Sequence, residues 1–207
     1  MTLILFDFDG VLADTMDDMI LFAQESCDEL GVKHKVVTQD LSMLEPMSFY
    51  QYGKSCEVPE HLLEDFVQRC LQKFASKESP PAIFDGMTGV LADLAQGNKI
   101  AIVTGNTSKN VSLFLREHKL EAFIQAIHGV DEPGSKVEKI RMAKENLSAG
   151  DEPVFMIGDS VSDIKSAKDA NVTSIAVQWG HQDTGMLLNA KPDHFIKTPA
   201  ELIEIVK

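Results

Sequence analysis

The sequence predicts an α/β fold, in which a parallel β-sheet is flanked by helices and an all-helical segment is inserted after the first strand. Short uninterrupted apolar runs recur along the chain, helical patterns separate them, and residues 14–82 show helical patterns without a convincing strand. Uninterrupted apolar runs are typical of strands that are covered on both faces, as in parallel sheets. Strands that alternate with helices indicate βαβ units with right-handed connections.

The first expected strand is the run TLILF at residues 2–6. Runs of the same character follow at residues 99–104, 123–129, 154–158 and 173–178. Between them, apolar residues at helical spacing predict helices over residues 110–120 and 136–147, and a further helix from residue 89 that stops near Gly97. These elements form the expected parallel-sheet body.

The inserted segment predicts helices near residues 15–30, 38–53 and 59–77, and the pair Pro80-Pro81 ends it. We therefore expect an α-helical cap domain over residues 14–82 and an α/β core over residues 1–13 and 83–207. Because both junctions lie beside the carboxyl end of the first strand, the inserted segment is expected to cover that end of the sheet as a lid.

Composition excludes several classes of protein. Hydrophobic residues make up 44% of the 207 residues and charged residues 25%, a mix typical of globular proteins. The net charge of -13 argues against nucleic-acid or anionic-membrane partners, which require clustered cations. No apolar run is long enough to span a membrane and no basic leader begins the chain, so we expect a cytoplasmic protein. Cys27, Cys56 and Cys70 form no CxxC pair and are expected to be reduced packing residues.

Asp7 and Asp9 follow the first expected strand and precede Gly10. Ligands of open α/β sheets bind outside the carboxyl ends of the strands. Side chains two residues apart on an extended chain point to the same side, so both carboxylates can reach one point. A hard divalent cation, Mg²⁺ foremost, would relieve their repulsion there. The alternative is a strand-end cap at Asp7 and a turn residue at Asp9.

Two further expected strands end in polar residues. Thr104, Gly105 and Asn106 offer a hydroxyl and backbone N–H groups of the kind that hold phosphate, although a turn with a helix cap has the same pattern. Asp159 follows the strand at residues 154–158, and Asp163 lies one helical turn further on. Asp163 either faces Asp159 or forms a capping box with Ser160, and the sequence leaves both open.

Lys136 begins an expected helix, where the helix dipole disfavours a cation. A lysine in that position indicates an anionic partner, and a solvated surface lysine is the alternative. Trp179 follows the strand at residues 173–178 and is interpreted as a packed loop aromatic. The six histidines show no metal-like spacing and are interpreted as surface or packing residues.

Together these motifs resemble the haloacid dehalogenase superfamily of phosphotransferases. The order is DxDGV at residues 7–11, then Thr104, Lys136 and GDSxxD at residues 158–163, and it covers nearly the whole chain. Within that superfamily the chain is most similar to the phosphoglycolate phosphatase-like branch. The resemblance implies a Rossmann-like parallel-sheet core with an α-helical cap inserted after the first strand.

The resemblance also implies catalytic roles. Asp7 would be the nucleophile that forms an aspartyl-phosphate, and Asp9 would protonate the leaving alkoxide and then deprotonate water. Thr104, Gly105, Asn106 and Lys136 would hold the phosphate oxygens.

Mg²⁺ is the implied cofactor. Its ligands would be Asp7, the Asp9 carbonyl, Asp159 and, through water, Asp163.

The expected function is hydrolysis of a small phosphorylated metabolite, phosphoglycolate-like or a sugar phosphate, with phosphoglycolate as the first candidate. Asp9 disfavours dehalogenase chemistry, because a departing halide needs no proton. A phosphohexomutase remains an alternative, weakened because Met19 stands where that branch usually carries a histidine. A non-catalytic phosphate-binding module is the third hypothesis. Ser48, Tyr50 and Lys54 are the cap residues considered for contacts with the rest of the substrate.

Overall fold

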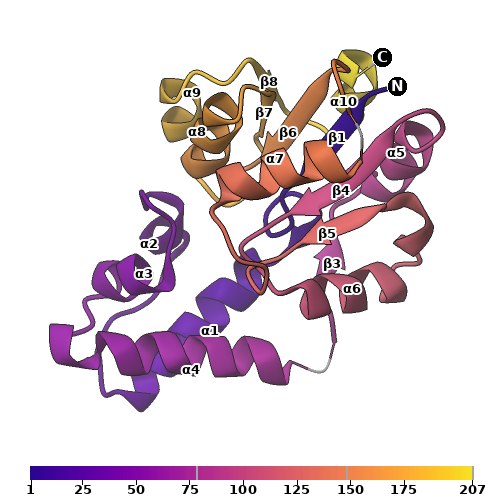
Figure 1. Cartoon of the computed structure of the whole chain (residues 1–207). Coiled ribbons are helices and arrows are strands. Elements are labelled where there is room, and N and C mark those ends of the chain that lie inside the picture. The colour runs from indigo at the N-terminus through magenta and orange to yellow at the C-terminus, as the bar shows by residue number, and fades with distance from the viewer. Residues whose placement is uncertain (78, 148, 207) are drawn as a thin grey trace.

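The structure, a computed structural model, describes residues 1–77, 79–147 and 149–206. Within these ranges, six strands form one parallel sheet in the order β5-β4-β1-β6-β7-β8 (Figure 1). These strands are β1 (Leu3–Phe6), β4 (Lys99–Val103), β5 (Ala126–His128), β6 (Val154–Gly158), β7 (Thr173–Val177) and β8 (His194–Ile196). The expected α/β architecture is therefore observed, with β1 and β6 side by side at the centre.

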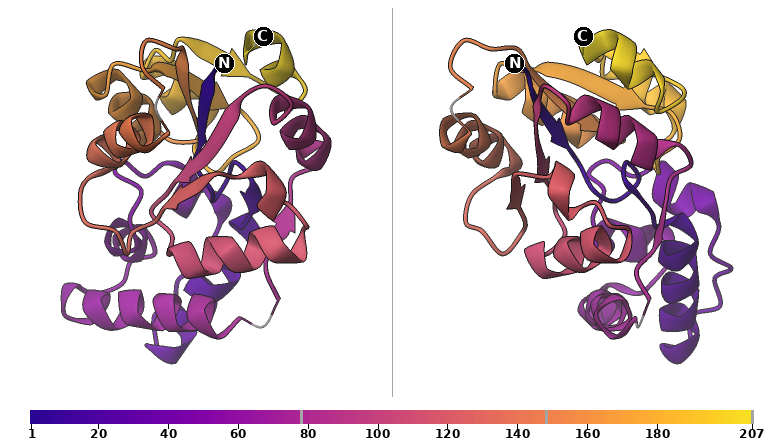
Figure 2. Two further views of the ribbon diagram at one scale, coloured as in Figure 1. Left: turned by 45° about the vertical axis from the view of Figure 1, so that its right-hand side comes forward. Right: turned by 90° about the vertical axis from the view of Figure 1, so that its right-hand side faces the viewer.

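Helices cover both faces of the sheet (Figure 2). On one face lie α5 (Met87–Leu94), α6 (Ser108–Glu117) and α10 (Glu201–Val206); on the other lie α7 (Lys136–Asn146) and α8 (Val161–Asp169). The short α9 (Thr184–Asn189) packs beside α8. Alternate residues of β1 enter opposite clusters, Ile4 and Phe6 on one side and Leu3 and Leu5 on the other. Burial on both faces explains why the run is uninterrupted.

The inserted segment forms its own helical group at the carboxyl end of β1 (Figure 1). Its elements are α1 (Met16–Glu29), α2 (Thr38–Ser42), α3 (Phe49–Ser55), the 3₁₀ turn η1 (Glu60–Leu62) and α4 (Leu63–Ser76). Tyr52 and Phe66 pack in a separate apolar cluster with the three cysteines, which are buried and free, as expected for packing residues. Of the helices in the described ranges, none has the length and apolar character needed to cross a membrane.

A two-stranded antiparallel ribbon joins the inserted helices to the sheet. Its strands are β2 (Ala13–Asp14) and β3 (Ala82–Ile83), which lie at the two ends of the inserted segment. The sequence analysis did not predict this ribbon, because two-residue strands are too short to show a pattern.

Two predicted elements differ from the structure. The helix expected over residues 38–53 is broken into α2 and α3, because Pro46 lacks an N–H group and its ring disfavours a helical residue before it. The strand expected over residues 123–129 is shortened to β5, because the 3₁₀ turn η2 (Glu121–Phe123) occupies its start. The break at residues 43–48 lies next to the candidate site.

Candidate active site

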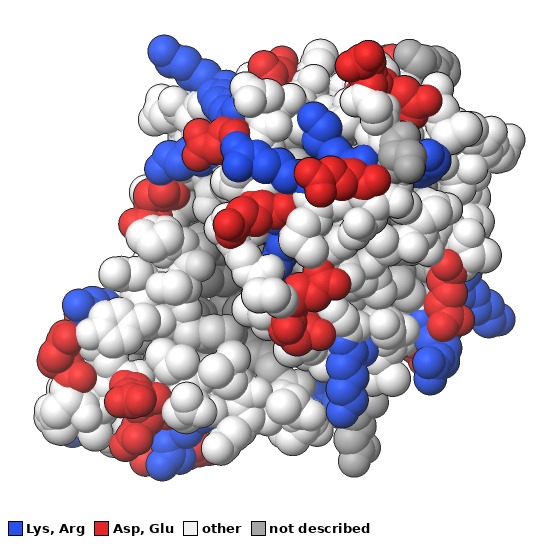
Figure 3. All heavy atoms as spheres, in the orientation of Figure 1, with Lys and Arg blue, Asp and Glu red and all other residues white. Residues whose placement is uncertain are grey.

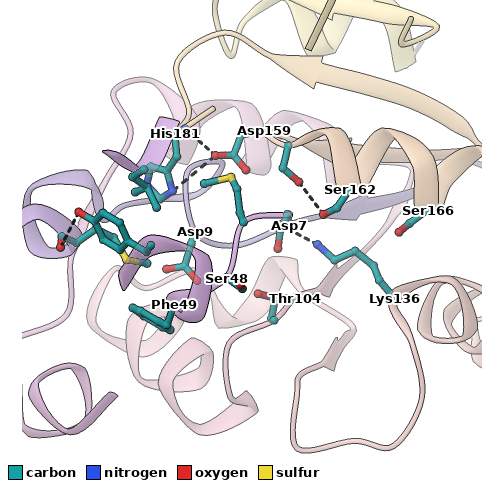
Figure 4. Close-up of a pocket in the computed structure, with 16 residues that line it drawn as sticks. Asp7, Asp9, Ser48, Phe49, Thr104, Lys136, Asp159, Ser162, Ser166 and His181 are labelled. Atoms are coloured by element: carbon teal, nitrogen blue, oxygen red, sulfur yellow. Dashed lines mark hydrogen bonds and ion pairs between the residues drawn. The ribbon is translucent and has the colours of Figure 1, made fainter. Parts of the chain in front are cut away.

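A cavity of about 350 Å³ lies between the carboxyl ends of the strands and the inserted helices. Figure 3 shows the surface hollowed in this region, and Figure 4 shows the lining side chains. Asp7 follows β1, Thr104 follows β4 and Asp159 follows β6, so three neighbouring parallel strands bring these residues to one edge of the sheet. The inserted helices supply the facing wall.

Asp7 is held by contacts to both carboxylate oxygens. The Phe8 N–H donates to Oδ1 over 2.8 Å, and Lys136 Nζ donates to Oδ2 over 2.9 Å (Figure 4). Burial raises the pKa of Asp7 to about 7, against the opposing charge of Lys136. Lys136 therefore offsets only part of the cost of placing a carboxylate in this cavity.

Asp163 has both of the roles that the sequence left open. It forms a capping box with Ser160, whose hydroxyl donates to Asp163 Oδ2 over 2.6 Å. Its other oxygen, Oδ1, accepts from Lys136 Nζ over 2.5 Å. Lys136 itself is the first residue of α7, so the helix places its ammonium group between Asp7 and Asp163 despite the unfavourable dipole.

Three carboxylates converge to form a candidate cation site. One oxygen each of Asp7, Asp159 and Asp163 lies within 4.8 Å of the others. Burial raises the pKa of Asp159 well above its usual value, and the charges of Asp163 and Asp7 raise it further. Three carboxylates, of which Asp159 and Asp163 are buried and Asp7 is partly buried, leave an excess of negative charge beside the single ammonium of Lys136, and this suits a hard divalent cation.

Glycines allow Asp159 to fit into this cluster. A Cβ at Gly10 would lie 2.0 Å from Asp159 Oδ2, and one at Gly180 would lie 2.2 Å from Asp159 Cβ. Gly10 also has a φ of +74°, a conformation that side chains with a Cβ rarely adopt. Glycine is thus required at position 10 for two reasons: Asp159 lies too close for a Cβ to fit, and the turn has a positive φ.

Asp9 has a different environment from Asp7. Its Oδ1 accepts from Thr15 Oγ1 over 3.3 Å, and its Oδ2 accepts from Asn106 Nδ2 over 3.0 Å. Burial raises the pKa of Asp9, while these two neutral donors oppose the shift. A carboxyl group held mainly by neutral donors and biased toward protonation is suited to giving and taking a proton.

The predicted phosphate-binding residues are only partly brought together. Thr104 and Gly105 line the cavity, and the buried Thr104 Oγ1 accepts the Asn106 N–H over 3.0 Å. Asn106 instead lines a smaller neighbouring hollow, and its side chain holds Asp9. Its N–H group is thus engaged by Thr104 rather than directed into the larger cavity.

His181 lines the cavity, and the sequence analysis did not include it among the candidate site residues. Its backbone N–H donates to Asp159 Oδ2 over 2.7 Å, and its ring nitrogen Nε2 lies 3.2 Å from Thr15 Oγ1. His181 therefore links the carboxylate cluster to the hydroxyl that holds Asp9. The only hint in the sequence was that His181 directly follows Trp179 and Gly180, in the loop after β7. Trp179 itself packs as expected, and its Nε1 donates to the Val11 carbonyl over 3.2 Å.

The sequence analysis likewise did not single out His34. The fold brings it together with Asp40 and Cys56, with one possible ligand atom of each within 4.8 Å of the others. Its Nε2 lies 2.8 Å from Asp40 Oδ2, and this contact raises the pKa of His34. This group lies among the inserted helices, and sequence spacing does not reveal it because its members are far apart in the chain.

Of the three cap residues considered for substrate contacts, Ser48 lines the cavity, whereas Tyr50 and Lys54 do not. Tyr50 donates its hydroxyl to Glu60 over 2.5 Å. Lys54 lies over the Tyr50 ring and 3.5 Å from Glu60. Tyr50 and Lys54 therefore occupy an exposed side of α3, away from the carboxylates of the cavity.

Comparisons with known proteins agree with this geometry. Residues 4–177 match the model of the haloacid dehalogenase-like hydrolase family. A phosphoglycolate phosphatase from Synechococcus elongatus is 25% identical over 211 residues, covering 100% of this chain and 97% of that protein. A pyrophosphatase from Listeria monocytogenes is 25% identical over 212 residues, covering 100% of this chain and 96% of that protein. A haloacid dehalogenase-like hydrolase from Streptococcus pneumoniae has the same fold, with a TM-score of 0.88, 22% identity and coverage of 100% and 99%.

The chain belongs to the haloacid dehalogenase-like hydrolase family. The resemblance expected from the four motifs is confirmed, and so are the predicted fold class and the predicted class of enzyme, a phosphatase of this family. The roles of individual site residues remain predictions at this point.

Proposed function

We propose that this protein is a Mg²⁺-dependent hydrolase of small phosphate monoesters that works through an aspartyl-phosphate on Asp7. One observation carries the proposal: Asp7, Asp159 and Asp163 converge at the strand ends, with Asp9 lining the same cavity. The family membership supports the hydrolase class. The names of the relatives supply phosphate esters as the class of substrate to test first.

Asp7 is the proposed nucleophile. Its backbone is fixed because its N–H donates to the Ile157 carbonyl over 2.8 Å, and its Oδ1 is fixed by the Phe8 N–H. The opposite oxygen, Oδ2, faces Lys136 and the cavity. An ionised carboxylate needs no partner base to attack phosphorus, so positioning is the main requirement.

Asp9 is the proposed acid and base. In its protonated form it would give a proton to the departing alkoxide, and the resulting carboxylate would then take a proton from the attacking water. The raised pKa that burial causes favours the first of these steps. Thr15 and Asn106 hold the side chain in place for both.

Mg²⁺ is the proposed cofactor, with Asp7, Asp159 and, directly or through water, Asp163 as side-chain ligands and the Asp9 carbonyl as a further one. When bound, it would neutralise charge on the phosphoryl oxygens. Lys136 and Thr104 would bind the remaining oxygens, together with N–H groups at Gly105 and Asn106. Because the Asn106 N–H is engaged by Thr104, its contribution requires a local rearrangement.

We further propose the division into an α/β core, residues 1–13 and 83–207, and an α-helical cap, residues 14–82. The separate apolar cluster of the inserted helices supports this division. The β2–β3 ribbon lies at both junctions and is the natural hinge for a lid over Asp7. Met19 lines the cavity, so the position expected to be histidine in a mutase presents an apolar side chain here. Hydrolysis is therefore favoured over the mutase alternative.

Release of inorganic phosphate from a panel of phosphate monoesters tests the proposed function. We expect turnover in Mg²⁺, loss of turnover in EDTA and recovery when Mg²⁺ is added back. Full turnover in EDTA would contradict the metal role. No turnover of any ester, from a folded protein that binds Mg²⁺, would favour the non-catalytic alternative.

A further inference from the structure

The wall that faces the carboxylates is apolar. The inserted segment contributes these side chains to the cavity: Met19, Leu41, Met47, Phe49 and Tyr52. Figure 4 shows Phe49 and Ser48 on this side of the cavity, opposite Lys136. A phosphate group placed at Asp7 directs the rest of the substrate toward this wall, because the sheet closes the other side.

The positive charges of the inserted segment lie elsewhere. Its Lys and Arg residues are Lys33, Lys35, Lys54, Arg69, Lys73 and Lys77. Four of them are ion-paired, Lys54 with Glu60, Arg69 and Lys73 with Glu29, and Lys77 with Asp18. The other two line a separate hollow around His34.

Lys136 is the only Lys or Arg among the described residues that line the cavity. Its ammonium group already lies between Asp7 and Asp163. The whole chain is also strongly acidic, with a net charge of -13. A second anionic group on the substrate would therefore approach this wall without a cationic partner. Burying an unpaired anion against an apolar surface is costly.

The polar groups near the wall are neutral hydroxyls. Ser48 Oγ accepts the Gln51 N–H over 3.2 Å, which leaves its hydroxyl hydrogen to donate to a ligand. Tyr52 donates its own hydroxyl to the Met19 carbonyl over 3.3 Å. Ser162 and Ser166 line the cavity from α8. Hydroxyls of this kind bind neutral polar atoms without supplying charge.

We propose that the substrates are phosphate monoesters whose leaving group is an uncharged alcohol with an apolar or aromatic surface. This inference rests on the proposed hydrolase function and names its substrate class. A cavity of about 350 Å³ accommodates a small ligand, at the lower end of the range of roughly 300–1,000 Å³ for such sites. The inference departs from phosphoglycolate, the first candidate from the sequence, because the leaving group of phosphoglycolate carries a carboxylate.

A matched pair of substrates tests the inference. 4-Carbamoylphenyl phosphate and 4-carboxyphenyl phosphate have nearly the same shape, but only the second has a charged leaving group. We expect kcat/KM in Mg²⁺ to be at least tenfold higher for the carbamoyl ester. Phosphoglycolate and 2-hydroxyethyl phosphate form a second pair, for which we expect the same order.

The variant Met47→Lys tests whether the wall sets this preference. A lysine there supplies the missing cation, so the ratio of kcat/KM values should shift at least tenfold toward the carboxyphenyl ester. Met47→Gln is the control, because it has similar length and no charge. In Met47→Gln, kcat/KM should remain higher for the carbamoyl ester than for the carboxyphenyl ester.

The outcomes separate the inference from the proposed function. Turnover of both esters at equal rates, or faster turnover of the carboxyphenyl ester, overturns the inference and leaves the hydrolase intact. Hydrolysis of neither ester, nor of any other phosphate ester, overturns both. If the ratio of kcat/KM values shifted equally in Met47→Lys and Met47→Gln, the absence of a cation on the wall would not be the cause of the preference, and the inference would be overturned.

Discussion

At the scale of single residues, the two aspartates of the DxDG motif are distinguished by their neighbours. Asp7 contacts the ammonium of Lys136, whereas Asp9 contacts the neutral donors Thr15 and Asn106. Two carboxylates two positions apart can therefore take different roles, one as a nucleophile and one as a proton carrier.

The raised pKa of Asp7 predicts how stability depends on pH. The pKa of Asp7 in the folded protein, about 7, exceeds the ordinary aspartate value of 3.8. Its contribution to stability is therefore full below about pH 4 and is lost as the pH rises through 7. In EDTA, we expect the free energy of unfolding to fall between about pH 4 and pH 7, by at most about 1.4 kcal/mol per pH unit for one proton, and to level off above pH 7.

Urea unfolding at several pH values measures this effect, with Asp7→Asn as the control. The variant has no carboxylate to ionise at this position, so its stability should depend less on pH. Equal slopes for the natural chain and the variant would show that Asp7 is not the group responsible.

Residue patterns predicted part of the site and missed the rest for a physical reason. Asp7, Asp159 and Thr104 each follow an apolar strand, so the rule that parallel strands end at one edge places them together. His181 and Thr15 follow no such rule, because their contact joins a loop after β7 to the start of α1. A contact of this kind depends on tertiary packing that local sequence does not encode.

At the scale of elements, the break between α2 and α3 has the largest consequence. Sequence periodicity predicted one helix over residues 38–53, whereas the segment at residues 43–48 leaves the helix and brings Met47 and Ser48 to the cavity. Pro46 was visible in the sequence, but the path of the chain around it was not. The parallel sheet was predictable because burial on both faces leaves a strong apolar signal.

Close packing of α3 against α4 gives a second prediction. A Cβ at Gly53 would lie 2.8 Å from Leu63 Cδ2 and 2.9 Å from Phe66 Cδ1. We expect Gly53→Ala to destabilise the protein by roughly 1–3 kcal/mol, because the helices must move apart. Thermal unfolding monitored by circular dichroism measures the change.

Gly89→Ala is the matched control for this substitution. Gly89 lies within α5, and no atom lies within 4 Å of the Cβ that an alanine would add there. The control should be neutral or stabilising, by up to about 1 kcal/mol, since alanine favours the helix. An unchanged melting temperature for Gly53→Ala would contradict the packing described here.

At the scale of the whole molecule, two parts of the chain, each with its own apolar core, form one cavity between them. The sheet and its helices hold the carboxylates, and the inserted helices, with their own apolar cluster, supply the opposing wall. The two parts are joined at the β2–β3 ribbon. Under the proposed function, the sheet would position the phosphate and the inserted segment would select the leaving group.

The central claim is that Asp7 carries the phosphoryl group during turnover. Acid quenching of the reaction, followed by reduction with tritiated borohydride and peptide mapping, tests it most directly, because the reduction displaces the phosphate and leaves tritium on the homoserine formed from the phosphorylated aspartate. We expect the label on the peptide that contains Asp7, more of it in Asp9→Asn because removal of the base slows hydrolysis of the intermediate, and none in Asp7→Asn. Turnover without protein-bound label in Asp9→Asn, or label at a different residue, would contradict the account.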